Sequence, residues 1–161
     1  EKREAIQYYA SQYFNHDSIF FIGRNVDYAL GLEGSLKLKE ISYIHSEAYA
    51  SGELKHGTIS LIEDGTLVVA VATYAKLFEK AMSNVVEVKS RGADVLALTT
   101  VEHVVEMGRV ANGVFGVPDT DELLLPSLGV APLQLLAYYI ALMRGCDIDK
   151  PRNLAKSVTV E

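Results

Sequence analysis

The sequence has little of what marks secreted, membrane-spanning or metal-binding proteins. Cys146 is the single cysteine in 161 residues, which excludes an internal disulfide and favours a reducing, cytoplasmic setting. We find no apolar run that approaches the roughly 20 residues of a membrane span, and no basic leader before a hydrophobic stretch. Neither the stretch from His45 to His56 nor the group Glu102, His103 and Glu106 has metal-ligand spacing. We therefore expect no membrane span, no metal and no cofactor.

Positive charge is also scarce and scattered. The net charge is −6, with 15 basic against 21 acidic residues, and nucleic-acid binding would require a basic face that the sequence lacks. The apolar share of 49% is high enough to exclude a disordered chain. The composition therefore favours a soluble, folded domain without identifying its function.

Apolar residues recur with helical spacing in some segments and form short continuous runs in others. This pattern predicts helices over residues 1–15, 27–44, 75–91, 101–107 and 131–143. It predicts strands over residues 18–22, 66–72, 94–98 and 114–117. Gly92 and Gly145 are expected to end helices, and Pro132 is expected in the first turn of the last one.

Strands that are apolar throughout and separated by helices are typical of parallel βαβ units. We therefore predict an α/β fold, a three-layer α/β/α sandwich with a mainly parallel, doubly wound sheet. One domain is expected over residues 1–145, followed by a tail over 146–161. Because the chain opens without methionine, we expect it to be the C-terminal piece of a longer protein.

Three charged residues share one face of the helix predicted over 27–44. Glu33, Lys37 and Glu40 stand at i, i+4 and i+7, which is typical of a solvated stripe held by charge pairs. The same spacing also suits a lysine and a carboxylate facing a cleft, where a carboxylate moves a carbon-bound proton in an aldose–ketose shift. Gly31 and Gly34 each weaken a helix by roughly 1 kcal/mol, which indicates close approach by backbone or ligand.

Two further segments carry reactive side chains. His56 lies between Gly52 and Gly57, and is either an exposed loop residue or an imidazole aimed for proton transfer near neutral pH. The tail is either a solvated chain end or a segment that docks over a cleft, with Pro151 stiffening its entry. In a partly dry pocket the amine of Lys156 would have a lowered pKa and would attack a sugar carbonyl.

The sequence shows no clear binding site for a sugar phosphate. A cradle for the phosphate uses backbone N–H groups and hydroxyls at a helix N-terminus. The turn after the first predicted strand, residues 23–27, has no hydroxyl and contains an acid. Thr99 and Thr100, after the third predicted strand, are a weak substitute.

Four stretches of the sequence closely resemble the isomerising glutamine–fructose-6-phosphate aminotransferases, or glucosamine-6-phosphate synthases: residues 32–45, 52–57, 132–139 and 151–161. The resemblance implies a longer enzyme with a glutaminase that releases ammonia and two sugar isomerase (SIS) subdomains. This chain resembles the second subdomain with its tail. The reaction implied is the conversion of fructose 6-phosphate to glucosamine 6-phosphate in hexosamine biosynthesis, by a homodimer.

The resemblance also implies roles for individual residues. Lys156 would form a Schiff base with the open-chain ketose, and Glu40 would carry the proton between C1 and C2. Lys37 would handle protons at the neighbouring substrate oxygen, and His56 would assist ring opening in the active site of the adjacent subunit. The phosphate ligands would belong to the first SIS subdomain. Further substrate-binding residues are expected at Glu33, Arg152 and Ala155.

Two other functions remain open from the sequence. A sugar-phosphate-sensing SIS module would require its own phosphate cradle and no reactive lysine in the tail. A deglycase or deaminase relative would use similar residues on an amino-sugar phosphate, without a glutaminase.

Overall fold

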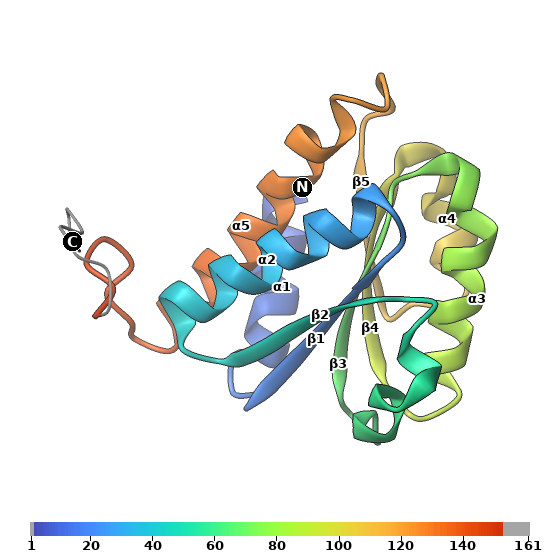
Figure 1. The fold of residues 1–161 in the computed structure, drawn as a ribbon. Helices are drawn as coiled ribbons and strands as arrows, with labels where there is room; N and C mark the ends of the chain where they lie inside the picture. The colour runs from blue at the N-terminus through green and yellow to red at the C-terminus, as the bar shows by residue number, and fades with distance from the viewer. Residues whose placement is uncertain (1, 153–161) are drawn as a thin grey trace, which may run out of the picture.

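A parallel sheet forms the middle layer of the fold (Figure 1). This computed structural model describes residues 2–152. The five strands follow the order β2-β1-β3-β4-β5, and every neighbouring pair is parallel. They are Ser18–Gly23 (β1), His45–Ala50 (β2), Leu67–Ala72 (β3), Asp94–Thr100 (β4) and Gly113–Val117 (β5).

Helices cover both faces of this sheet (Figure 1). One layer contains Lys2–Tyr13 (α1), Val26–Ser42 (α2) and Leu125–Met143 (α5). The other contains Phe78–Lys89 (α3) and Val104–Met107 (α4). Short 3-10 turns lie at Leu54–His56 (η1), Thr58–Leu61 (η2), Ala75–Leu77 (η3) and Val101–His103 (η4). The predicted three-layer, doubly wound α/β fold is confirmed.

Strand β3 shows how one short run of residues supplies both cores. Its six residues are all buried. Leu67, Val69 and Val71 pack into the core beneath α1, α2 and α5. Val68 and Ala70 pack into the core beneath α3. Successive side chains of a strand point to opposite faces, so a central strand between two helical layers is apolar at every position.

Strand β2 was not predicted from the sequence. Three of its six residues, His45–Ala50, are polar, as suits a strand at the edge of the sheet that pairs with β1 alone. Ser46 is its one buried residue, and its hydroxyl donates to the carbonyl oxygen of Ser35 at 2.9 Å. The strand is therefore fixed by pairing and by this contact with α2, and its composition carries little strand signal.

Helix α5 differs from the sequence prediction in two ways. It begins at Leu125, so Pro132 lies inside the helix and Pro126 occupies its first turn. The helix also carries no charged residue along 19 positions. By length and composition alone it is apolar enough to cross a membrane, a run that was not recognised in the sequence. Leu133, Leu136 and other buried residues of α5 pack in the core with α1 and α2, which accounts for the apolar run.

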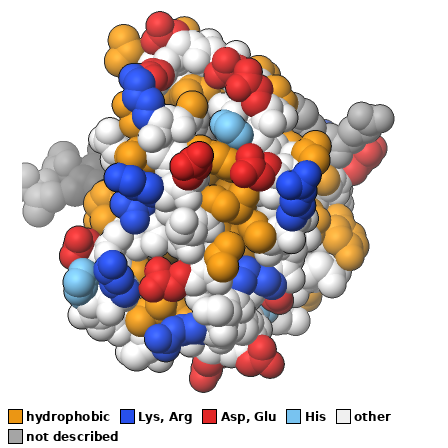
Figure 2. All heavy atoms as spheres, turned by 90° about the vertical axis from the view of Figure 1, so that its right-hand side faces the viewer, with side chains coloured by type: hydrophobic (Ala, Val, Ile, Leu, Met, Phe, Trp, Pro, Cys, Tyr) orange, Lys and Arg blue, Asp and Glu red, His pale blue; other side chains and the backbone are white. Residues whose placement is uncertain are grey.

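The outer side of α3 and α4 shows acidic and basic side chains interspersed (Figure 2). No large area of this view is covered by lysine and arginine alone. This distribution agrees with the net charge of −6. On this face, the structure offers no basic surface of the kind that binds nucleic acid.

Candidate functional site

Helix α2 brings the three predicted charged residues together on one face. The Nζ atom of Lys37 lies 2.6 Å from Oε2 of Glu40 and 3.8 Å from Oε1 of Glu33. The side chains of Lys37, Glu40 and Glu33 are 31%, 26% and 40% exposed. This face is therefore reached by solvent or by a ligand, while the helix holds the three groups in fixed relation.

The contact between Lys37 and Glu40 sets the charge of the lysine. The hydrogen bond to Glu40 raises the pKa of Lys37, burial opposes this shift, and the negative charges of Glu40 and Glu33 add to it. Lys37 is therefore an ammonium group at neutral pH. It can donate a hydrogen bond or a proton to a substrate oxygen, beside a carboxylate that can accept one.

One of the two glycines of α2, Gly34, has a packing explanation. A Cβ on Gly34 would lie 2.9 Å from Cδ1 of Leu133 and 2.9 Å from Cε1 of Phe21. A Cβ on Gly31 would lie 3.6 Å from Cβ of Phe21. At Gly34 the close approach predicted from the sequence is therefore that of α5 and β1, because the atoms in contact belong to core side chains, whereas Gly31 leaves room for a Cβ at an ordinary contact distance.

The segment after α5 docks at the C-terminal end of α2. Arg144 donates from Nε to the carbonyl oxygen of Ser42 at 3.0 Å, and the thiol of Cys146 lies 3.8 Å from the same oxygen. The backbone N–H of Arg152 donates to the hydroxyl of Tyr43 at 2.9 Å. The chain that leads into the predicted tail thus follows the end of the helix that carries Lys37 and Glu40.

His56 lies away from the lysine–carboxylate pair in this chain. It ends η1 at the far end of β2, whereas Lys37 and Glu40 lie near the end of α2 that precedes β2 (Figure 1). Six residues of extended strand span roughly 20 Å. The imidazole is exposed. Within one chain, the structure therefore brings Lys37 and Glu40 together and leaves His56 separate.

The crossover between the two helical layers lies between β1 and β3, where doubly wound sheets bind ligands. Here the carboxylate of the buried residue Asp27 occupies that place. It accepts the backbone N–H groups of Thr73 and Tyr74, both at 3.0 Å, and the hydroxyl of Thr73 at 2.5 Å. Burial raises the pKa of Asp27, and these hydrogen bonds oppose the shift.

Other groups at this edge are also used internally. Arg24 donates from Nε to Oδ1 of Asn84 at 2.9 Å. The hydroxyl of Thr99 is fully buried and donates to the carbonyl oxygen of Ala72 at 2.7 Å. Among the residues that the structure describes, Thr73 and Thr99 at this edge thus have internal partners for their hydroxyl groups. This agrees with the weak phosphate cradle inferred from the sequence.

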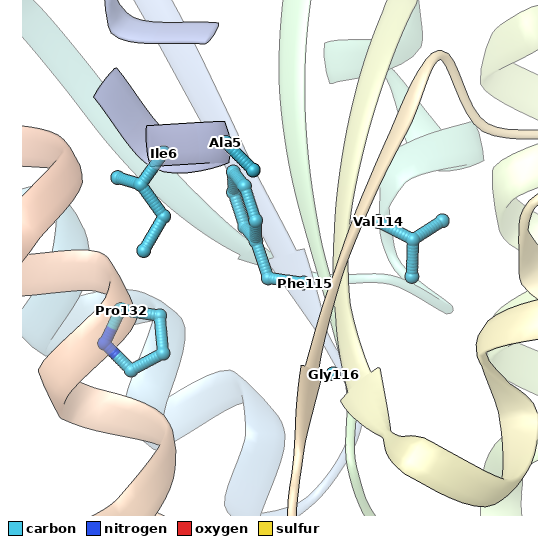
Figure 3. A pocket seen from close by; sticks show the side chains of 6 residues that line it. All are labelled: Ala5, Ile6, Val114, Phe115, Gly116 and Pro132. Carbon is cyan, nitrogen blue, oxygen red and sulfur yellow. The ribbon is translucent and has the colours of Figure 1, made fainter. Parts of the chain in front are cut away.

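A small cavity of about 80 Å³ lies between α1, β5 and α5 (Figure 3). Figure 3 shows Ile6, Phe115 and Pro132 around it, while Val114 points to the other side of β5. The residues that line it have apolar side chains or are glycine. The cavity therefore offers no polar side chain with which to orient a sugar phosphate.

The remaining predicted residues divide into two groups. Arg152 is described, and its guanidinium carbon lies 3.9 Å from the centre of the Tyr43 ring. Ala155 and Lys156 lie outside the described residues.

Across residues 2–152, no group of three or more His, Cys, Asp or Glu side chains is arranged to hold a metal ion. Sequence reasoning missed Tyr43, whose only signal is its place directly after the charged helix.

Comparison with known proteins identifies relatives along the whole chain. Residues 12–144 match the SIS domain family. The isomerising glutamine–fructose-6-phosphate aminotransferase of Caldanaerobacter subterraneus is 57% identical over 161 residues, which is 100% of this chain and 26% of that protein. This chain thus spans about a quarter of the length of that relative.

Two solved structures extend the comparison. The C-terminal domain of glucosamine-fructose-6-phosphate aminotransferase from Francisella tularensis superposes with a TM-score of 0.86 at 36% identity, covering 91% of this chain and 41% of that one. Glucosamine-6-phosphate deaminase from Thermotoga maritima gives a TM-score of 0.71 at 28% identity, covering 98% and 46%. Both likenesses therefore cover more than nine tenths of this chain.

Proposed function

The chain belongs to the SIS domain family, and on that premise we propose that it is the C-terminal isomerase half of a glutamine–fructose-6-phosphate aminotransferase. The observation that carries the proposal is the Lys37–Glu40 pair, 2.6 Å apart on a partly exposed face of α2, beside the docked start of the tail. The substrate is fructose 6-phosphate and the product is glucosamine 6-phosphate, a step of hexosamine biosynthesis.

The residues divide the chemistry between them. The neutral amine of Lys156 adds to the C2 carbonyl of the open-chain ketose, and water leaves as the Schiff base forms. Ammonia from the glutaminase then displaces the lysine at C2. Glu40 removes a proton from C1 and returns it to C2, which gives the aldose. The ammonium group of Lys37 serves the adjacent substrate oxygen, and Glu33, Arg152 and Ala155 bind substrate.

The proposal requires parts that this chain does not supply. This chain covers 41% of the Francisella tularensis C-terminal domain, which leaves room there for a second unit of similar size. We assign the phosphate ligands to that unit, the first SIS domain, because Asp27 fills the crossover crevice of this one. We retain residues 1–145 as the second SIS domain and 146–161 as the tail that closes the site. The isolated chain should therefore be inactive.

A second subunit completes the site in this proposal. His56 is exposed and separated from Lys37 and Glu40 by the length of β2, so it suits the active site of a neighbouring copy in a homodimer. Cys146 has no second cysteine with which to pair, which suits a reducing cytoplasm. A stand-alone sugar-phosphate sensor is less well supported, because such a sensor needs a phosphate cradle of its own.

Trapping of the covalent adduct tests the proposal. In the full-length enzyme, borohydride should reduce the Schiff base with fructose 6-phosphate to a stable secondary amine on Lys156. The Lys156→Ala variant should give no adduct, while Lys150→Ala, a nearby exposed lysine, should give the normal amount. Adduct formation by Lys156→Ala would exclude Lys156 as the Schiff-base residue.

A further inference from the structure

Tyr43 has a backbone conformation that its side chain does not favour. It follows the last residue of α2 with φ 61° and ψ 15°, in the left-handed region. Glycine is the usual residue at this place, because a Cβ is sterically unfavourable there. Asn25 is the one other non-glycine residue with positive φ among the described residues. A bulky aromatic residue in this conformation indicates that its side chain is needed.

The side chain of Tyr43 makes two contacts with the same residue. Its hydroxyl accepts the backbone N–H of Arg152 at 2.9 Å. The guanidinium group of Arg152 lies over the ring of Tyr43. Its central carbon is 3.9 Å from the ring centre, well within the range of a cation–π contact. One side chain thus fixes both the backbone and the side chain of a residue 109 positions later in the sequence.

The chain between α5 and Arg152 is held as well. Arg144 donates to the carbonyl oxygen of Ser42 at 3.0 Å. Further along, the carboxylate of Asp147 accepts the backbone N–H groups of Asp149 and Lys150 at 3.1 and 3.0 Å. The segment is therefore held to Ser42 at its beginning, turns at Asp147 and is held to Tyr43 at its end. Its path is set by the C-terminal end of α2.

We propose that Tyr43 is a positioning residue that anchors the start of the C-terminal tail to the helix carrying Lys37 and Glu40. This inference rests on the proposed function. Lys156 follows Arg152 by four residues, which span at most about 14 Å when fully extended, and Tyr43 follows Glu40 by three. Anchoring Arg152 at Tyr43 limits how far the amine can lie from Glu40, which raises its effective concentration at the sugar.

The test uses the full-length enzyme and four variants. Tyr43→Gly removes both contacts and relieves the strained backbone, so the fold should be retained. Tyr43→Phe removes the hydroxyl contact alone, and Arg152→Lys removes the planar group from the ring. Arg109→Ala, at an exposed arginine remote in sequence from the tail, is the control.

Two readouts separate anchoring from catalysis. In the absence of sugar, limited proteolysis should cut the segment after Met143 roughly tenfold faster in Tyr43→Gly than in the control, because local opening governs cleavage. With fructose 6-phosphate, the borohydride trapping rate and kcat should fall by roughly tenfold, with a smaller change in KM. Tyr43→Phe should show intermediate effects in both readouts. Arg152→Lys changes a residue that is also assigned to the substrate, so it is compared by proteolysis alone and should be cut at an intermediate rate.

Each outcome decides a separate point. Equal cleavage of Tyr43→Gly and the control would overturn the anchor. Faster cleavage with unchanged trapping and kcat would overturn the positioning role. If Lys156→Ala still formed the adduct, the proposed function would fail, whereas the proteolysis comparison would still report on the anchor. The proposal is supported if Tyr43→Gly shows faster cleavage together with slower trapping, and if both changes are smaller in Tyr43→Phe.

Discussion

The ammonium nitrogen of Lys37 lies 2.6 Å from Oε2 of Glu40, one turn along the same helix. Both side chains remain partly exposed, and exposed ion pairs contribute little to folding. A second lysine–glutamate pair joins residues far apart in sequence, since Nζ of Lys76 lies 2.8 Å from Oε1 of Glu122. The two pairs therefore allow a stabilising role to be separated from a catalytic one.

Replacing Lys37 should affect activity far more than stability. In the full-length enzyme, Lys37→Met should cost about 0.5 kcal/mol or less of unfolding free energy, as for other helical charge pairs. Product formation should fall by roughly 10²- to 10⁴-fold, the range for loss of a general acid. Urea unfolding and a glucosamine 6-phosphate assay measure the two effects. Lys76→Met is the matched control, and equal activity in the two variants would contradict the assignment.

The two glycines of α2 should respond in opposite directions to alanine. Gly31→Ala places its Cβ at an ordinary contact distance, so the gain in helix propensity should stabilise the chain by roughly 0.5–1 kcal/mol. Gly34→Ala brings its Cβ to 2.9 Å from both Leu133 and Phe21, so overpacking should destabilise it by about 1–3 kcal/mol. Thermal unfolding of both variants tests this, and a shift of the same sign for both would refute the packing explanation.

The carboxylate of Asp27 should stabilise the fold by accepting hydrogen bonds from the backbone after β3. In Asp27→Ala, the backbone N–H groups of Thr73 and Tyr74 lose their acceptor, which should cost about 2–6 kcal/mol for two donors left unpaired. Asp27→Asn keeps an acceptor oxygen and should cost less. Urea unfolding of the two variants provides the comparison, and equal losses would show that the accepted hydrogen bonds are not the cause.

Asp27 should also give a defined pH dependence. Because burial raises its folded-state pKa above 3.8, its contribution to stability is fully present below that value and is lost as the pH rises through the folded pKa. The wild-type chain should therefore lose stability relative to Asp27→Asn as the pH rises above about 4. Urea unfolding at several pH values measures the difference, and a difference independent of pH would contradict the raised pKa.

Two inactive variants should restore activity when they share a dimer. If His56 serves the neighbouring subunit, a hybrid of Glu40→Gln and His56→Ala subunits contains one intact site. An equal mixture that exchanges subunits freely should therefore recover roughly a quarter of wild-type activity, because half the dimers are hybrids with one of two sites intact. The mixture would recover nothing if both residues served the same subunit.

Local patterns were sufficient to predict most of the fold. The strands beginning at Ser18, Leu67 and Asp94 are buried on both faces, so their apolar runs were visible in the sequence. Strand β2 was missed because an edge strand depends on its pairing with β1. The start of α5 was placed too late because Pro132 was taken as a first-turn residue, although the helix continues on both sides of it.

The site was predictable where its residues are close in sequence. Glu33, Lys37 and Glu40 share a face because of helical spacing, and the structure places them together. The contact between Tyr43 and Arg152 joins residues 109 positions apart, and no local pattern indicates it. The cause of Gly34 was likewise hidden, because it depends on Leu133 of a distant helix.

The most direct measurement compares adduct and product in the Glu40→Gln variant of the full-length enzyme with fructose 6-phosphate and glutamine. Because Lys156 is assigned to the carbonyl and Glu40 to the later proton transfer, the variant should form the borohydride-trapped adduct at the wild-type level. It should form glucosamine 6-phosphate at least 10²-fold more slowly, the scale expected for loss of a general base. Product formation at the wild-type rate, or loss of the trapped adduct together with the product, would contradict this division of the chemistry.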